Sequence, residues 1–221
     1  MRSTNGRRAA PKHEFSLPEL AGFDGRGLEP RRDYDAISFV DVDLSGQDAP
    51  DGRFLECRLE RCQLDGLSLR RARFVSSLLE ECHATPVDLA DTTWRESQIS
   101  GGRLGAVMLA GATWTDVRVH DANLGFLNLA GAHLQDVVFE RCEIGTFDAR
   151  AAELTSLTFV DCKIDELNVT GATLSKVDLS GARLRSLVGV ESLRGAIVSH
   201  EQLLDLAPIL AAQLGLEVRP D

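Results

Sequence analysis

Residues 122–141 read ANLGFLNLAGAHLQDVVFER, and a large apolar residue returns in this stretch at every fifth position. The same column runs without insertion or deletion from Phe39 to Leu184, where 27 of its 30 positions are large and apolar and three are alanine. A second column of small or apolar residues lies two positions earlier, from Ile37 to Leu187, with Gln47 as the plain exception. A period of five fits neither an α-helix nor a flat strand. It indicates a short extended segment followed by a corner.

The residue expected at the corner, two positions after each column residue, has the composition of a turn. Glycine supplies positive φ without steric cost, and the aspartate side chain hydrogen-bonds its own backbone. The corner glycines and aspartates are Gly46, Gly66, Gly101, Gly111, Gly131, Gly171, Gly181, Asp41, Asp51, Asp91, Asp116, Asp121, Asp136 and Asp161.

This pattern resembles the pentapeptide-repeat family, whose motif is A(D/N)LXX. The clearest matches are Ala122-Asn123-Leu124, Asn128-Leu129-Ala130-Gly131-Ala132, Gly171-Ala172-Thr173-Leu174 and Val177-Asp178-Leu179-Ser180-Gly181. The resemblance implies an all-β fold, a right-handed quadrilateral β-helix with four pentapeptides per coil. Within the family, the chain resembles the mycobacterial fluoroquinolone-resistance type, which also has an uninterrupted solenoid.

The size of the residues in the second column supports a 20-residue coil independently of the resemblance. When the second column is divided into groups whose members are 20 positions apart, one group contains small residues and another contains large ones. A repeat of five residues alone would not separate them by size. The small class is Gly52, Ala72, Thr92, Ala112, Ala132, Ala152 and Ala172, and the large class is Leu67, Val87, Val107, Leu127, Phe147, Leu167 and Leu187. At ~4.8 Å per coil, about 7.5 coils make a rod of about 36 Å.

The two ends of the chain depart from the repeat, and a solenoid needs its open edges covered. We expect a disordered tail over residues 1–12, an N-terminal cap over 13–36, the solenoid over 37–188 and a C-terminal helical cap over 189–221. Ser199-His200-Glu201-Gln202 reads as a capping box that opens the helix. Pro208 predicts a kink or two short helices. Four helix leucines form a candidate dimer surface: Leu203, Leu206, Leu210 and Leu214. The resemblance supports pairing through this cap, because several family members dimerise at their C-terminal ends.

We find no motif for catalysis, for a cofactor or for a metal, and we expect a protein that is not an enzyme. The five cysteines, Cys57, Cys62, Cys82, Cys142 and Cys162, all fall in the second column and are expected to be small buried residues, with a metal site as the minor alternative. Their odd number favours reduced thiols and a cytoplasmic protein. His83, His120 and His133 are expected on different faces, and Trp94 and Trp114 in the core rather than on a ligand platform.

The net charge of −10 argues against a direct nucleic-acid partner and disfavours anionic membrane surfaces. One corner carries a candidate acidic stripe, diluted by Arg61 and Arg141: Asp41, Glu60, Glu80, Glu81, Asp121, Glu140 and Asp161. We therefore expect a scaffold that presents an acidic surface to an unassigned protein partner. The resemblance provides the alternative, a DNA mimic that binds DNA gyrase or topoisomerase and confers resistance to quinolones or topoisomerase toxins. Either form could act as a homodimer.

Overall fold

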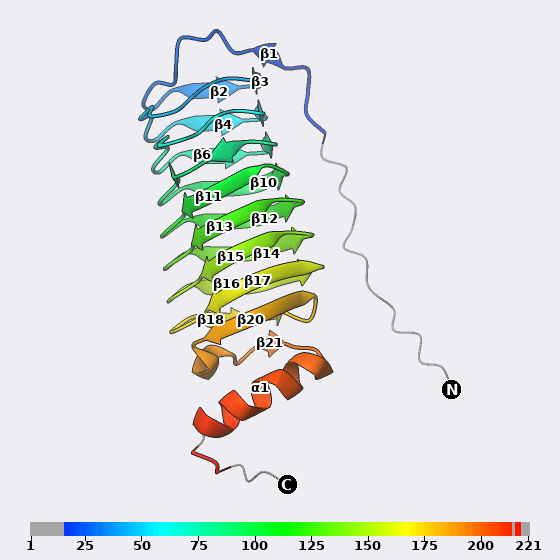
Figure 1. Cartoon of the computed structure of the whole chain (residues 1–221). Coiled ribbons are helices and arrows are strands. Elements are labelled where there is room, and N and C mark those ends of the chain that lie inside the picture. The colour runs from blue at the N-terminus through cyan, green and yellow to red at the C-terminus, as the bar shows by residue number, and fades with distance from the viewer. Residues whose placement is uncertain (1–15, 214, 218–221) are drawn as a thin grey trace, which may run out of the picture.

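The computed structural model describes residues 16–213 and 215–217, and it is a rod of stacked coils with one helix across its C-terminal end (Figure 1). About half of the residues are in strands, which form a parallel β-solenoid of about nine turns. The predicted quadrilateral β-helix with a C-terminal helix is confirmed. The predicted tail at 1–12 lies outside the described residues.

The strands form two parallel sheets along the rod. The first sheet contains β1 (Ala21–Gly22), β2 (Asp33–Asp35), β3 (Ile37–Val40), β4 (Arg53–Leu55), β5 (Arg58–Glu60), β6 (Arg73–Val75), β7 (Leu78–Glu80), β10 (Thr93–Ser100), β12 (Thr113–His120), β14 (His133–Glu140), β16 (Glu153–Val160), β18 (Thr173–Ser175), β19 (Val177–Asp178) and β21 (Ala196–Ile197). The second sheet contains β8 (His83–Ala84), β9 (Val87–Asp88), β11 (Arg103–Met108), β13 (Asn123–Asn128), β15 (Glu143–Asp148), β17 (Cys162–Asn168) and β20 (Ala182–Val188).

The register of the strands shows that one coil is 20 residues. Trp94 pairs with Phe74 on one side and with Trp114 on the other, and Leu104 pairs with Ala84 and Leu124. Each coil therefore has four five-residue sides. We name them from the coil 92–111: side A is centred on Trp94, side B on Ile99, side C on Leu104 and side D on Leu109. A corner is named by the two sides that it joins.

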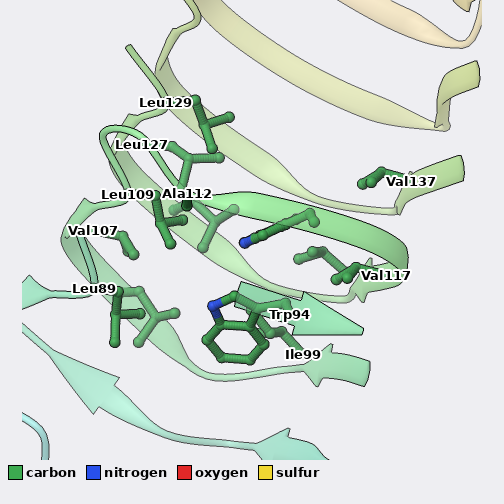
Figure 2. Close-up of a cluster of buried hydrophobic side chains, with 14 of the residues drawn as sticks. Leu89, Trp94, Ile99, Val107, Leu109, Ala112, Val117, Leu127, Leu129 and Val137 are labelled. Atoms are coloured by element: carbon green, nitrogen blue, oxygen red, sulfur yellow. The ribbon is translucent and has the colours of Figure 1, made fainter. Parts of the chain in front are cut away.

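The interior of the rod is the predicted apolar column. Every column residue from Phe39 to Leu179 is buried, and Leu184 at the last coil is half-buried. Figure 2 shows these side chains pointing into the coil from facing sides, with Trp94 and Ile99 opposite Leu89 and Val107. Because one coil stacks directly on the next, each buried residue contacts its own equivalent one coil away, and stability passes from neighbour to neighbour.

The corners use the left-handed backbone region that the composition predicted. All seven corner aspartates have φ between 50° and 62°, and every predicted corner glycine except Gly181 has positive φ. Residues without a turn preference, such as Arg61 and Lys176, adopt the same conformation. A left-handed residue other than glycine costs about 1–2 kcal/mol, so the stacked core must hold these corners in place.

The CD corner changes its construction along the rod. In the first coils it is a left-handed glycine, Gly46 or Gly66, whereas Ala106, Phe126 and Thr146 at the same corner have no positive φ. In the later coils β11, β13 and β15 run straight through this corner. A glycine column at 105, 125 and 145 makes this possible, because a Cβ on Gly125 would lie 2.4 Å from the Gly105 carbonyl oxygen.

The coil pairing begins at Asp33 in β2, four residues before the predicted start of the solenoid at 37. Tyr34 is buried and stacks on Phe54 with ring centroids 4.9 Å apart, so it extends the apolar column by one coil. The capping strand β1 pairs with β3 at an offset of 16 residues. The Leu28 amide donates to the Gln47 side-chain oxygen at 2.7 Å, which shows why a polar residue interrupts the second column here.

The C-terminal end also differs from the predicted boundary at 188. After β20 and the short 3₁₀ helix η1 (Val190–Ser192), β21 still pairs with β19, at an offset of 19 residues in place of 20. The chain then forms one helix, α1 (His200–Gln213), so the prediction of two short helices was wrong. Pro208 has no N–H to donate to the carbonyl of Leu204, and both residues are exposed to water.

The predicted capping box at the start of α1 is confirmed. The Ser199 amide donates to the Gln202 side-chain oxygen at 2.8 Å, and the Gln202 amide donates to the Ser199 hydroxyl at 3.1 Å. The Gln202 side-chain nitrogen also donates to the carbonyl oxygens of Leu179 and Ala182, each at 2.7 Å. A glutamine therefore anchors the cap at each end of the solenoid, because an amide can satisfy the open backbone groups of a terminal coil.

Candidate interaction surface

The predicted acidic stripe lies along the BC corner and the adjacent edge of side B. Most of its carboxylates are paired with arginines from neighbouring positions. Asp41 accepts two hydrogen bonds from Arg61 at 2.8 and 2.9 Å, and Asp121 accepts two from Arg141 at 2.7 and 2.8 Å. Arg58 lies 2.9 Å from Glu60 and 2.5 Å from Glu80.

Some of the other stripe residues also form ion pairs. Glu140 is paired with Arg141, and Glu60 also contacts Arg61. Among the residues that the structure describes, only Glu81 and Asp161 of the stripe have no ion pair. The structure brings the seven predicted residues together along one edge, and three arginines, Arg58, Arg61 and Arg141, share ion pairs with five of them.

The pairing changes the acidity of the stripe. The hydrogen bonds from Arg141, and then from His120, lower the pKa of Asp121 to about 2. The bidentate contact with Arg61 likewise lowers the pKa of Asp41. Both carboxylates stay ionised at neutral pH, yet each is held by its arginine. A partner that bound here through a basic side chain would have to compete with an existing salt bridge.

A second acidic edge lies at the AB corner. Glu96, Asp116 and Asp136 occupy this corner in three successive coils, and all three are exposed. We call these three residues the acidic edge. Within the described chain no cation lies within ion-pair distance of Asp116 or Asp136, and Glu96 has only Arg95 at 3.5 Å. Because the three residues are 20 positions apart, an alignment of the sequence in rows of 20 would have placed them in one column and predicted the acidic edge.

Stacking like charges one coil apart is unfavourable. Strands are ~4.8 Å apart, and two carboxylates at 5 Å repel each other by about 0.8 kcal/mol in water before screening by salt. The BC corner relieves this repulsion by alternating Asp121 with Arg141, whereas the AB corner leaves it in place between Asp116 and Asp136. The acidic edge therefore keeps unpaired negative charge on neighbouring coils.

The cysteines, tryptophans and histidines lie at the positions that the repeat predicted. The five cysteines are buried, and Trp94 and Trp114 are buried in the core. Burial raises the pKa of the Cys57 thiol to about 11. His83, His120 and His133 lie on sides C, B and A. No group of three or more histidine, cysteine, aspartate or glutamate residues in the described part of the chain is placed to hold a metal ion.

The helix α1 presents apolar side chains to solvent as well as to the solenoid. Of the predicted dimer surface, Leu203 is exposed, Leu206 is buried against the last coil, and Leu210 is half-buried. Leu214 lies outside the described residues. The exposed large apolar residues at this end of the rod are Val188, Ile197, Leu203, Leu204, Ile209 and Leu216. No helix among the described residues is both long and apolar enough to cross a bilayer.

The chain is thus a parallel β-solenoid with four five-residue sides per coil. Residues 37–74 match the family described as pentapeptide repeats, in 8 copies. The same coil continues beyond the matched residues, to residue 188. A comparison with curated proteins gives no match.

Solved structures provide further similarities. The chain is 18% identical to HetL, a pentapeptide-repeat protein involved in heterocyst differentiation regulation from the cyanobacterium Nostoc sp. strain PCC 7120, covering 76% of this chain and 90% of that one, with a TM-score of 0.38. It is 18% identical to trypsin-treated QnrB1, a plasmid-mediated fluoroquinolone resistance protein, covering 90% of this chain and 95% of that one, with a TM-score of 0.32. Both TM-scores are below 0.5, and the likeness to pentapeptide repeats rests on the matched residues and on the coil geometry.

Proposed function

We propose that this protein is a non-enzymatic scaffold that binds a partner protein through the acidic edge formed by Glu96, Asp116 and Asp136. The observation that carries this proposal is the difference between two corners of the same coils. At the BC corner Arg61 and Arg141 pair with Asp41 and Asp121, while within the described chain no arginine or lysine pairs with Asp116 or Asp136 at the acidic edge. A partner that places lysines or arginines along this edge would relieve the repulsion, and complementary charge would also speed its approach.

The test compares two variants that remove the same charge from different corners. One neutralises the acidic edge with Glu96→Gln, Asp116→Asn and Asp136→Asn. The matched control, Glu81→Gln, Asp161→Asn and Asp165→Asn, removes three exposed carboxylates that take part in no ion pair within the described chain. Partners are captured from cells that contain the protein and quantified by mass spectrometry. We expect the edge variant, and not the control, to lose a specific salt-sensitive partner. Equal loss from both, or loss from neither, would reject the acidic edge as the binding surface.

A second candidate is the alternative given by the sequence resemblance, a DNA mimic that binds DNA gyrase. The observation that favours it is the uneven distribution of charge along the rod. Residues 81–180 contain 15 acidic and 7 basic residues, a net charge of −8. These five coils span about 24 Å, over which B-DNA carries about 14 negative charges. The later coils therefore reach more than half the charge density of DNA.

Gyrase itself tests this second candidate. Supercoiling is measured with and without ciprofloxacin in the presence of the wild-type protein and the edge variant. Mimicry predicts inhibition or protection that weakens when the acidic edge is neutralised. If neither effect occurs with a gyrase that responds to a known mimic, the second candidate is excluded and the scaffold proposal is unaffected.

We also propose that α1 pairs two copies of the chain. The support is the concentration of exposed apolar residues at this end, including Leu203 and Leu204 at 47% and 61% exposure. Sedimentation analysis of the wild type and of Leu204→Glu tests the pairing, with Leu55→Glu, near the opposite end, as the control. A dimer that dissociates only in the helix variant is expected. A wild type that stays monomeric at high concentration would overturn the proposal.

A further inference from the structure

A groove on the first coils is lined by four arginines and two aspartates. Its lining residues are Arg31, Asp33, Asp51, Arg53, Arg71 and Arg73, and its volume is about 570 Å³. The residues come from the DA corner and from the first outward position of side A. The lining has four cations and two anions, so it is positive although the chain as a whole has a net charge of −10.

The arginines of this groove are unequally neutralised. Arg71 donates two hydrogen bonds to Asp51, each at 2.9 Å. Arg53 lies 3.7 Å from Asp33, and both side chains are more than 60% exposed, so this pair is weak. Arg31 and Arg73 form no ion pair with any residue that the structure describes. Arg31 and Arg73 are therefore available to an external anion, and Arg53 is held only by its weak pair with Asp33.

Arg53 and Arg73 lie directly beside each other. They are register partners in the neighbouring parallel strands β4 and β6, so the bases of their side chains are one strand spacing apart. Like charges placed side by side in a sheet are destabilising. An oxyanion between the two would remove the repulsion, and each guanidinium can donate two parallel hydrogen bonds to it.

An apolar surface borders the arginine pair. Leu55 and Val75 follow Arg53 and Arg73 by two positions on the outward face of the same strands, and they are register partners as well. Leu55 is 42% exposed, which is unusual for a large apolar residue outside the C-terminal end of this rod. The combination fits a molecule with a charged end and an apolar body.

We propose that this groove binds a small molecule that carries a phosphate or pyrophosphate group next to an apolar body, with Arg53 and Arg73 as the main phosphate ligands. A long nucleic acid or an anionic membrane fits less well. Either would extend beyond the groove over a surface that carries Glu56 and the acidic edge, and the phosphates would be repelled there. A short ligand avoids these carboxylates. The proposal is independent of the partner surface at the acidic edge.

Calorimetry with the full chain tests the groove, using inorganic pyrophosphate and a nucleoside diphosphate as probes. The double variant Arg53→Gln with Arg73→Gln should weaken the binding of both probes by at least about tenfold, since it removes the charged donors of the hydrogen bonds to phosphate. The matched control, Arg103→Gln with Arg183→Gln, removes two exposed arginines from side C that also lack an ion pair in the described chain, and should leave affinity unchanged. All four side chains point outward, and circular dichroism confirms that the variants remain folded.

The variant Leu55→Ser tests the contact with the apolar part of the proposed ligand separately from the contact with its phosphate. It should weaken the binding of the nucleoside diphosphate and leave the affinity for pyrophosphate unchanged. The proposal is overturned if the wild type binds neither probe at millimolar concentration, or if the arginine variants bind as well as the wild type. Tighter binding of single-stranded DNA or of phosphatidylserine vesicles than of the nucleotide would also overturn it, since either would identify a macromolecular surface.

Discussion

The first coils and the later coils share one backbone repeat but differ on both their inner and outer faces. Residues 31–80 contain 8 arginines within 50 residues, whereas residues 81–180 contain 7 basic residues within 100. Inside side A, the column is aromatic from Tyr34 through Phe54, Phe74 and Trp94 to Trp114, and then becomes leucine. Side A is therefore aromatic inside the arginine-rich first coils and aliphatic inside the acidic later coils, where the buried rings of Phe139, Phe147 and Phe159 lie on sides B and D.

This difference shows that the coil constrains size and polarity without specifying identity. A ring and a leucine both fill side A, because the second column there is small, from Ala72 to Ala172. Outward positions are freer still, since water accepts arginine and aspartate alike. Function in such a rod is therefore expected in the outward residues, where the two regions differ most.

The largest expected effect comes from the aromatic stack. The Phe74 ring lies 4.7 Å from that of Phe54 and 4.0 Å from that of Trp94, and both pairs are stacked. Phe74→Ala should lower the free energy of unfolding by about 3–5 kcal/mol. Leu154→Ala, at the same position in the later coils, should cost roughly 1 kcal/mol less because it breaks no ring stack. Urea denaturation measures both, and an equal or larger loss for Leu154→Ala would contradict the contrast.

The CD corner predicts the next largest effect. Gly125→Ala would place a Cβ 2.4 Å from a backbone oxygen, and the later coils would have to separate. We expect a loss of roughly 3 kcal/mol. Gly46 at the corner of the first coils has φ of +67° and no atom within 4 Å of an added Cβ, so Gly46→Ala should cost only about 1 kcal/mol. Thermal unfolding of the two variants compares them. A smaller loss for Gly125→Ala would show that the glycine column is dispensable.

The two tryptophans give a smaller contrast between neighbouring coils. The Trp94 side-chain N–H donates to the Thr92 hydroxyl at 3.0 Å, whereas the buried Trp114 N–H has no acceptor among the described residues, where the equivalent position is Ala112. Trp94→Phe loses a hydrogen bond, and Trp114→Phe removes an unsatisfied donor. Trp114→Phe should therefore be less destabilising by about 1–2 kcal/mol. If denaturation shows that Trp94→Phe is the milder change, this assignment of the hydrogen bonds is wrong.

The smallest effect concerns the BC corner and pH. Arg141 lowers the pKa of Asp121 to about 2, below its unfolded value near 3.9. The pair therefore contributes its full stability above pH 4, and this contribution is lost as the pH falls through about 2. Asp121 and Arg141 are 47% and 50% exposed, so the effect should be below about 1 kcal/mol. In Arg141→Gln, NMR titration should show the pKa of Asp121 moving up toward its usual range. An unchanged titration would exclude Arg141 as the main cause.

The period of five predicted the interior of this protein because every coil repeats the same packing problem. The buried residues from Phe39 to Leu179 and the left-handed corner aspartates follow directly from it. Tyr34 lies five residues before Phe39 and fits the same column, but the segment before it contains Gly25, Gly27 and Pro30, and its stacking on Phe54 shows that it is part of the first coil.

The surface was predicted less well, for a physical reason. Sequence placed Asp121 and Arg141 one coil apart but did not show that the guanidinium would reach back to bond both carboxylate oxygens. It also left open whether Leu206 would face solvent or the last coil. Side-chain reach and end packing depend on neighbours that are distant in sequence.

Spacing along the chain was enough to set the solenoid, its 20-residue coil and its buried column, because each coil must bury its apolar residues against the next. Tertiary structure alone decided which charges remain free. A salt bridge forms between atoms a few ångströms apart, and that distance depends on where each side chain comes to rest on the folded coil.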